Sequence, residues 1–126
     1  MLRKSVFAVV ASAILFVVPA HAEGDAAAGA KVFNQCKACH DVEKGVNKVG
    51  PTLKGVVGRK AAAVADYKYS EAMIAKGAEG LVWDEANLTT YLANPKAFVP
   101  KTKMAFAGLK KPEDIANVIA FLKEHP

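Results

Sequence analysis

Cysteine is scarce in this sequence: the chain has only two, Cys36 and Cys39, and they stand three positions apart. Two cysteines so close together cannot form the several cross-links with which small exported domains compensate for a small core. Any covalent stabiliser of this chain must therefore be a group that these two cysteines hold together.

Clusters of basic residues are also missing, although the net charge is +5. The only arginines are Arg3 and Arg59, and the lysines form no continuous run. A nucleic-acid-binding surface normally needs such a cluster, so we do not expect a nucleic-acid partner. The sequence also lacks internal repeats, low-complexity linkers and the alternation of polar and apolar residues that is typical of strands.

The one long hydrophobic run lies near the N-terminus, over residues 6–18. The basic pair Arg3-Lys4 precedes it, and the small residues of Ala20-His21-Ala22 follow it, which is the three-part pattern of a secretory signal. The run has about 13 residues, short of the roughly 20 that cross a bilayer. We predict a signal peptide, residues 1–22, cleaved to leave one periplasmic, soluble domain, residues 23–126.

Capping residues predict an all-α domain with long loops. Asp25, Ser70 and Asp84 are predicted N-caps, and Pro112 is a predicted first helical residue. The predicted helices run from Asp25 into Cys36, from Ser70 to near Gly77, from Asp84 to just before Pro95, and from Pro112 onward with apolar positions 115, 118, 119 and 122 on one face. Residues 41–59 and 94–111 are predicted as loops.

The pentapeptide Cys36-Lys37-Ala38-Cys39-His40 is the C-x-x-C-H pattern of covalent haem attachment. In a helical turn, residues i, i+3 and i+4 share one face, so both thiols can reach the vinyl groups of one porphyrin. The adjacent imidazole of His40 then points at the iron. A thioredoxin-like dithiol would need a βαβ setting, and a zinc site would need a fourth ligand, so the sequence predicts one haem c.

Three residues of the predicted domain could provide the second axial ligand of the iron: Met73, Met104 and His125. His125 lies almost at the chain end, and Met73 lies in a short predicted helix, where methionine usually fills a core. Met104 lies in a long loop that can wrap one side of a haem, so we predict Met104. A thioether with an imidazole favours ferrous iron and leaves no open site, which indicates electron transfer rather than catalysis.

Further motifs resemble the class I c-type cytochromes, in particular the cytochrome c2 and mitochondrial-like group. The resemblance spans residues 24–123 and implies the cytochrome c fold, with crossed N- and C-terminal helices, close at Gly29, around one covalent haem. The matching pieces are Gly24-Asp25, Gly29, Phe33, the C-x-x-C-H motif, Gly50-Pro51-x-Leu53, Gly58-Arg59, Tyr69, Gly80-Leu81-x-Trp83, Tyr91-Leu92-x-Asn94-Pro95, Pro100-x-Thr102-Lys103-Met104 and Phe106-x-Gly108.

The resemblance also implies roles around the haem. The carbonyl of Pro51 would accept the free ring N–H of His40, and Tyr91 would hydrogen-bond the Met104 sulfur. The remaining implied haem-binding residues are Arg59, Tyr69, Trp83 and Thr102, which would hold the propionates, and Phe106, which would shield the haem edge. Without the resemblance, Trp83 could be a core residue and Arg59 a solvated surface charge.

The same resemblance implies an electron carrier, not an enzyme, and a monomer. Its partners would be membrane redox complexes of photosynthesis or respiration: a cytochrome bc1-type donor, and a photosynthetic reaction centre or terminal oxidase as acceptor. The implied partner-binding lysines are Lys48, Lys96, Lys103, Lys110 and Lys111. Two alternatives stay open at this point: a cytochrome c subunit of a periplasmic redox enzyme, and a five-coordinate haem peroxidase or gas-binding protein.

Overall fold

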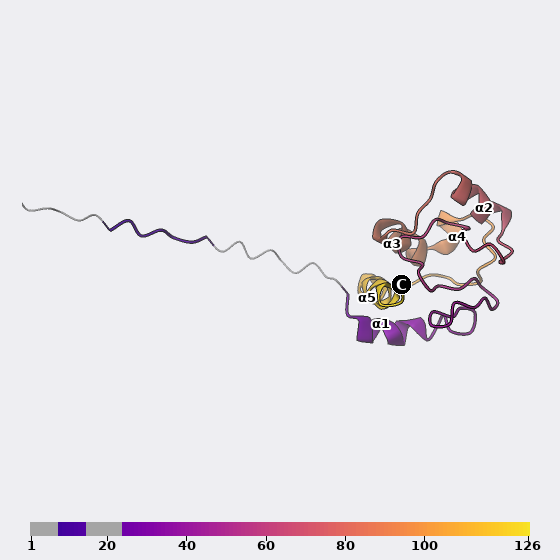
Figure 1. The fold of residues 1–126 in the computed structure, drawn as a ribbon, viewed down its shortest axis with the longest axis horizontal. Helices are drawn as coiled ribbons and strands as arrows, with labels where there is room; N and C mark the ends of the chain where they lie inside the picture. Colours follow the sequence, from indigo (N-terminus) through magenta and orange to yellow (C-terminus); the bar gives the residue numbers. More distant parts are fainter. Residues whose placement is uncertain (1–7, 15–23) are drawn as a thin grey trace, which may run out of the picture.

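The computed structural model describes residues 8–14 and 24–126 (Figure 1). Most of the predicted signal peptide therefore lies outside the described residues, and residues 8–14 form neither helix nor strand. None of the described helices is both long enough and apolar enough to cross a membrane.

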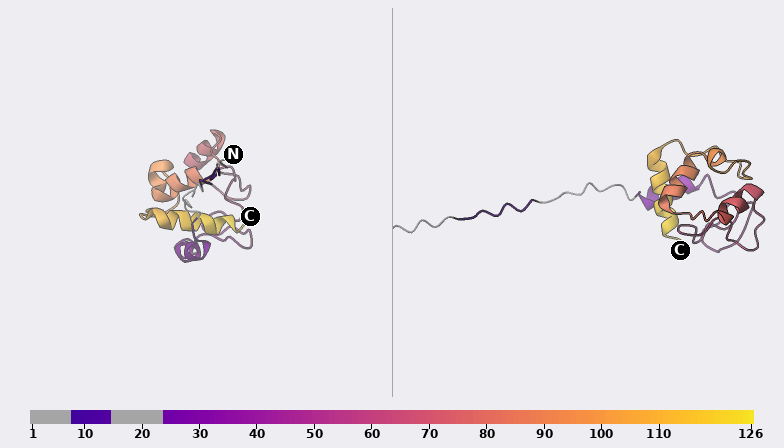
Figure 2. Two further views of the ribbon diagram at one scale, coloured as in Figure 1. Left: turned by 90° about the vertical axis from the view of Figure 1, so that its left-hand side faces the viewer. Right: turned by 90° about the horizontal axis from the view of Figure 1, so that it is seen from above.

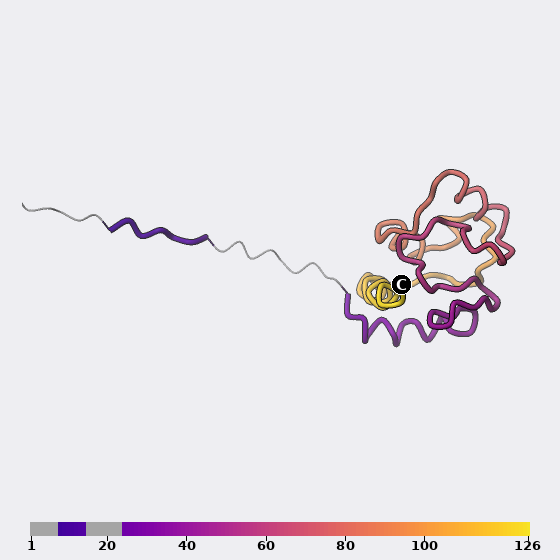
Figure 3. The backbone as a smooth tube through the Cα atoms, viewed as in Figure 1, coloured from indigo at the N-terminus to yellow at the C-terminus, as the bar shows by residue number. Residues whose placement is uncertain are grey.

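The all-α prediction is confirmed. The helices are α1 (Ala26–Phe33), α2 (Glu71–Ala78), α3 (Glu85–Ala93), α4 (Pro95–Phe98) and α5 (Pro112–Lys123). In the part of the chain that the structure describes, β-pairing is limited to one isolated bridge between Lys60 and Val82. The long irregular segments lie to one side of α1 and α5 (Figure 3).

The predicted N-caps are confirmed by their hydrogen bonds. A carboxylate oxygen of Asp25 accepts the N–H of Ala27 at 2.9 Å, and a carboxylate oxygen of Asp84 accepts the N–H of Asn87 at 2.8 Å. The hydroxyl of Ser70 accepts the N–H of a residue in the first turn of α2 at 3.1 Å. Each cap satisfies an N–H group that the helix itself leaves unpaired.

Two helix boundaries differ from the prediction. Helix α1 ends at Phe33 and does not run into Cys36. The predicted loop 94–111 contains the short helix α4, because the side chain of Asn94 accepts the N–H of Ala97 at 3.3 Å. Pro95 takes the first helical position, where its missing N–H costs no hydrogen bond. The same Asn94-Pro95 pair therefore ends one helix and begins another.

Helices α1 and α5 cross in close contact, as Figures 1 and 2 show from two sides. The crossing depends on Gly29, because a Cβ atom there would collide with the carbonyl oxygen of Asn117. Beside it, the rings of Phe33 and Phe121 lie 5.0 Å apart, centre to centre. The crossed terminal helices that the resemblance implied are therefore present.

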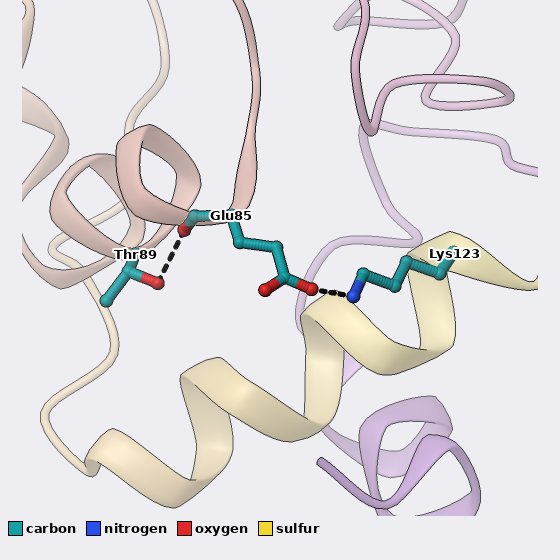
Figure 4. Close-up of polar contacts among 3 residues, drawn as sticks. All are labelled: Glu85, Thr89 and Lys123. Atoms are coloured by element: carbon teal, nitrogen blue, oxygen red, sulfur yellow. Dashed lines mark hydrogen bonds and ion pairs between the residues drawn. The ribbon is translucent and has the colours of Figure 1, made fainter. Parts of the chain in front are cut away.

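Helix α3 also packs against α5. An ion pair joins Glu85 of α3 to Lys123 of α5, and the carbonyl of Glu85 also accepts the hydroxyl of Thr89 at 2.7 Å (Figure 4). Both charged side chains are largely exposed, so the pair adds little to stability. The apolar face of α5 provides most of the packing, with Ile115, Val118, Ile119 and Leu122 all buried as predicted.

Candidate haem site

A cavity of about 450 Å³ lies between the loops and the helices. Residues of the segments 35–59, 67–73 and 102–106 line it, together with Trp83, residues of α3 and one residue of α5. Every residue that the sequence analysis assigned to the haem lies in this wall: Cys36, Cys39, His40, Pro51, Arg59, Tyr69, Trp83, Tyr91, Thr102, Met104 and Phe106.

The C-x-x-C-H segment forms a single helical turn at the cavity wall. The carbonyl of Cys36 accepts the N–H of Cys39 at 3.1 Å and that of His40 at 2.9 Å. Both cysteines are half-buried and neither forms a disulfide. Before haem is attached, burial and the neighbouring Cys39 raise the pKa of the Cys36 thiol, so the free thiol is protonated at neutral pH.

His40 is held in one orientation. Its Nδ1–H donates to the carbonyl oxygen of Pro51 at 2.8 Å, which leaves Nε2 as the free lone pair. Burial lowers the pKa of His40, and the positive charges of Arg59 and Lys48 lower it further, although the Pro51 hydrogen bond opposes them. A neutral imidazole with a free Nε2 is the form that binds a metal. A Cβ atom at Gly50 would collide with this ring, so only glycine fits there.

Met104 is half-buried and fixed by its neighbours. Its N–H donates to the hydroxyl of Thr102 at 3.2 Å. The hydroxyl of Tyr91 donates to the Met104 sulfur across 3.8 Å. Burial raises the pKa of Tyr91, so the hydroxyl stays protonated and can keep donating. The sulfur atom is thus positioned by a donor on α3 while its own loop holds the backbone.

The guanidinium of Arg59 lacks one hydrogen-bond partner, which an anion could provide. One Nη of its guanidinium donates to the carbonyl of Thr52 at 2.9 Å, but the buried Nε has no partner. Burial lowers the pKa of this group, which reflects the cost of holding its charge away from water. None of the described cavity-lining residues is acidic. A carboxylate on a bound molecule, such as a haem propionate, would satisfy both the Nε and the charge.

The aromatic residues of the wall come from several segments. Trp83 is buried, and its ring centre lies 4.8 Å from that of Tyr91. The hydroxyl of Tyr69 accepts the N–H of Val64 at 3.1 Å and can still donate into the cavity. Two thiols, an imidazole, a thioether and an unpaired guanidinium therefore meet in one mainly apolar cavity. This set of groups fits a haem.

Two residues that the sequence motifs do not assign to the haem, Tyr67 and Met73, also line the cavity. Tyr67 lies edge-on to Tyr69 at 4.8 Å, and its hydroxyl donates to the carbonyl of Val49 at 2.9 Å. Met73, which the sequence predicts as core filler, is half-buried against the core but also lines the cavity. The spacing of two tyrosines two positions apart could have indicated the first, whereas nothing local distinguishes Met73 from an ordinary core residue.

All five lysines of the predicted partner surface are exposed. Lys103 lines the cavity, and its ammonium group donates to the carbonyl of Lys68 at 3.1 Å. Lys48 precedes Val49, an exposed residue of the same wall. The remaining three, Lys96 in α4, Lys110, and Lys111 at the N-cap of α5, do not line the cavity.

Comparisons with known proteins identify the family of this chain. The family model described as cytochrome c matches residues 26–126. Cytochrome c2 of Afifella marina is 56% identical over 98 residues, which are 77% of this chain and 79% of the relative. Cytochrome c2 of Rhodomicrobium vannielii is 50% identical over 116 residues, 91% of this chain and 90% of the relative. The structure of cytochrome cH from Methylobacterium extorquens is 54% identical, with a TM-score of 0.72, covering 80% of this chain and 99% of the other.

The chain belongs to the cytochrome c family. Within it, the chain is a class I c-type cytochrome of the c2 type, which confirms the resemblance that the sequence motifs indicated. It carries one covalently attached haem c, and it is an electron carrier rather than an enzyme.

Proposed function

We propose that this chain is a diffusible periplasmic carrier, released by removal of residues 1–22. It would take one electron from a membrane cytochrome bc1-type complex and deliver it to a photosynthetic reaction centre or a terminal oxidase. The supporting observation is that His40 and Met104 line one cavity, so that two protein ligands can fill both axial positions. With neither position open to a substrate, the transfer of single electrons is the remaining role.

In this proposal, Cys36 and Cys39 hold the haem through thioether bonds, and His40 and Met104 bind its iron. The bound haem provides a one-electron Fe(III)/Fe(II) couple. The Pro51 carbonyl fixes the His40 tautomer, and Tyr91 holds the Met104 sulfur, so both ligands keep their positions as the charge changes. The largely apolar wall excludes water.

The remaining haem contacts are proposed from the same cavity. Arg59 would neutralise a propionate through its unpaired Nε, and Tyr69, Trp83 and Thr102 would donate to the propionates. Phe106, half-buried in the wall, would shield the haem edge.

The role of Met104 can be tested by replacing it with lysine. We expect Met104→Lys to lose the weak far-red absorption band of ferric thioether ligation, because an amine takes the place of the sulfur. The reduction potential should fall by at least about 0.1 V, within the roughly 0.8 V range that haem axial ligands span. A redox titration followed optically measures both. Met73→Leu is the control, and loss of the band in Met73→Leu together with an unchanged band and potential in Met104→Lys would contradict the assignment.

The proposed partner surface consists of five exposed lysines, of which Lys103 lines the cavity: Lys48, Lys96, Lys103, Lys110 and Lys111. Exposed lysines near an electron exit would attract an acidic partner and speed the encounter without forming a tight complex. Such weak complexes suit electron carriers, whose interfaces are small.

We expect Lys103→Glu to slow electron delivery to host membranes several-fold at low salt, because the change repels an acidic partner. The difference should fade near physiological ionic strength, where charges are screened beyond about 8 Å. The matched control is Lys60→Glu, which makes the same charge change at an exposed position outside the cavity wall. Equal slowing in both variants would mean that net charge, and not this surface, sets the rate.

A further inference from the structure

The cavity wall contains a second thioether that the proposed function does not use. Met73 and Met104 are the methionines of residues 24–126, and both are half-buried and line the same cavity. Iron in a c-type haem accepts a thioether readily, and soft sulfur ligands favour its ferrous state. Met73 is therefore chemically equivalent to the proposed axial ligand.

Helix α2 carries Met73 beside the segment that carries Met104. The ammonium group of Lys76 in α2 lies 5.6 Å above the ring of Phe98, at the end of α4. Just before α2, the carbonyl of Lys68 accepts the ammonium group of Lys103, the residue next to Met104. These two contacts join α2 and its entry to the segment 98–104.

Helix α2 is also only lightly packed. Of its eight residues only Gly77 is buried, and it lies in the last turn against the carbonyl of Ala61. Ile74 is 53% exposed, and Met73 lies in the first turn, at the end opposite to Gly77. A methionine side chain has three rotatable bonds and adapts to irregular spaces. The first turn of α2 can therefore adjust more easily than the α1–α5 pair.

Two other potential iron ligands, His125 and Lys103, are less suitable than Met73. The ring of His125 lies 4.7 Å from that of Phe121, and this residue does not line the cavity. Lys103 does line the cavity, but its ammonium group already donates to a carbonyl and would have to lose a proton before binding iron.

We propose that Met73 is a reserve axial ligand for the haem iron. It forms part of the cavity wall while Met104 binds the iron, and it binds the iron when the Met104 sulfur is lost. One sulfur–iron bond replaces another, with no electron or proton gained. The iron then stays closed to small ligands, so the carrier does not become a five-coordinate haem protein. This inference rests on the proposed role of Met104 as the normal ligand.

The test compares three variants of the full, haem-loaded protein: Met73→Leu, Met104→Ala, and Met104→Ala/Met73→Leu. We expect the ferric far-red band to persist in both single variants and to disappear in the double variant. Imidazole should bind ferric Met104→Ala about tenfold more weakly than the double variant, as it must if Met73 occupies the iron about nine-tenths of the time. Leucine at position 73 preserves the apolar wall, so the comparison isolates the sulfur.

Other outcomes would contradict either the role of Met104 as the normal ligand or the role of Met73 as the reserve ligand. Loss of the band in Met73→Leu alone would show that Met104 is not the normal ligand, and the proposed function would need revision. Loss of the band in Met104→Ala, with imidazole affinity equal to that of the double variant, would overturn the reserve-ligand proposal. The iron of Met104→Ala could also lack the band and still bind imidazole weakly. If adding Lys103→Gln then strengthened imidazole binding, the Lys103 amine would be the ligand, and the reserve-ligand proposal would again be overturned.

Discussion

Replacing both Cys36 and Cys39 with alanine is expected to leave a chain that does not fold cooperatively. Without covalent attachment the cavity of about 450 Å³ has nothing to fill it. Water would enter the cavity instead, so its mainly apolar walls would lose a stabilisation of about 25 cal/mol per Å² of apolar surface, in a domain whose total stability is typically about 5–15 kcal/mol. The largely apolar walls and the uncompensated guanidinium of Arg59 would then favour the unfolded chain.

Thermal unfolding followed by circular dichroism measures this effect. The single variants Cys36→Ala and Cys39→Ala are the matched comparison, because one thioether can still hold the haem in place. They should retain a cooperative transition at a reduced temperature. A cooperative transition in the haem-free double variant at the temperature of the parent protein would contradict the prediction.

Gly29→Val is expected to destabilise the haem-loaded protein by more than about 3 kcal/mol, the range typical of severe overpacking. The new Cβ would collide with the carbonyl oxygen of Asn117 and lie 2.9 Å from the Cβ of Phe121. Both obstacles belong to α5, whose opposite face is fixed in the core, so relief requires separating the two helices. Chemical denaturation of the loaded protein provides the free energy of unfolding.

The control for this prediction is Ala27→Val, in the same helix but on its exposed side. It has the same β-branched side chain and should cost only the difference in helix propensity, at most about 0.7 kcal/mol. If both substitutions destabilise the protein equally, the close crossing at Gly29 is not a determinant of stability.

Local features of this fold could be predicted from the sequence, whereas features that need distant segments could not. Asp25, Ser70 and Asp84 were identifiable as caps because a cap depends on the next three residues only. Asn94 was harder to interpret, since its backbone ends α3 while its side chain caps α4. The sequence indicates one boundary there and the structure has two.

In the candidate site, too, local features could be predicted from the sequence, whereas features that need distant segments could not. The C-x-x-C-H spacing indicates its own chemistry because all its residues lie in one turn. The distant wall, including Arg59 and Tyr91, was assigned only through the family resemblance, since no local pattern brings these residues together. Tyr67 was identified by neither route, and Met73, a candidate ligand in the sequence, was predicted to fill the core. Their place in the wall depends on how the segment 61–70 and α2 fold over the cavity.

The crossing of α1 with α5 has a consequence for the order in which the protein matures. The N–H of Asp25 donates to the side chain of Asn117 across 92 positions of sequence, so the two ends of the domain must meet before the fold is complete. A chain synthesised from its N-terminus presents Cys36 to His40 long before α5 exists. Haem attachment can thus precede closure of the fold, and a covalently held haem shortens the chain loops that remain to be closed. A chain that ends before Pro112 would keep the two cysteines that hold the haem but would lack α5, and it could not close the fold.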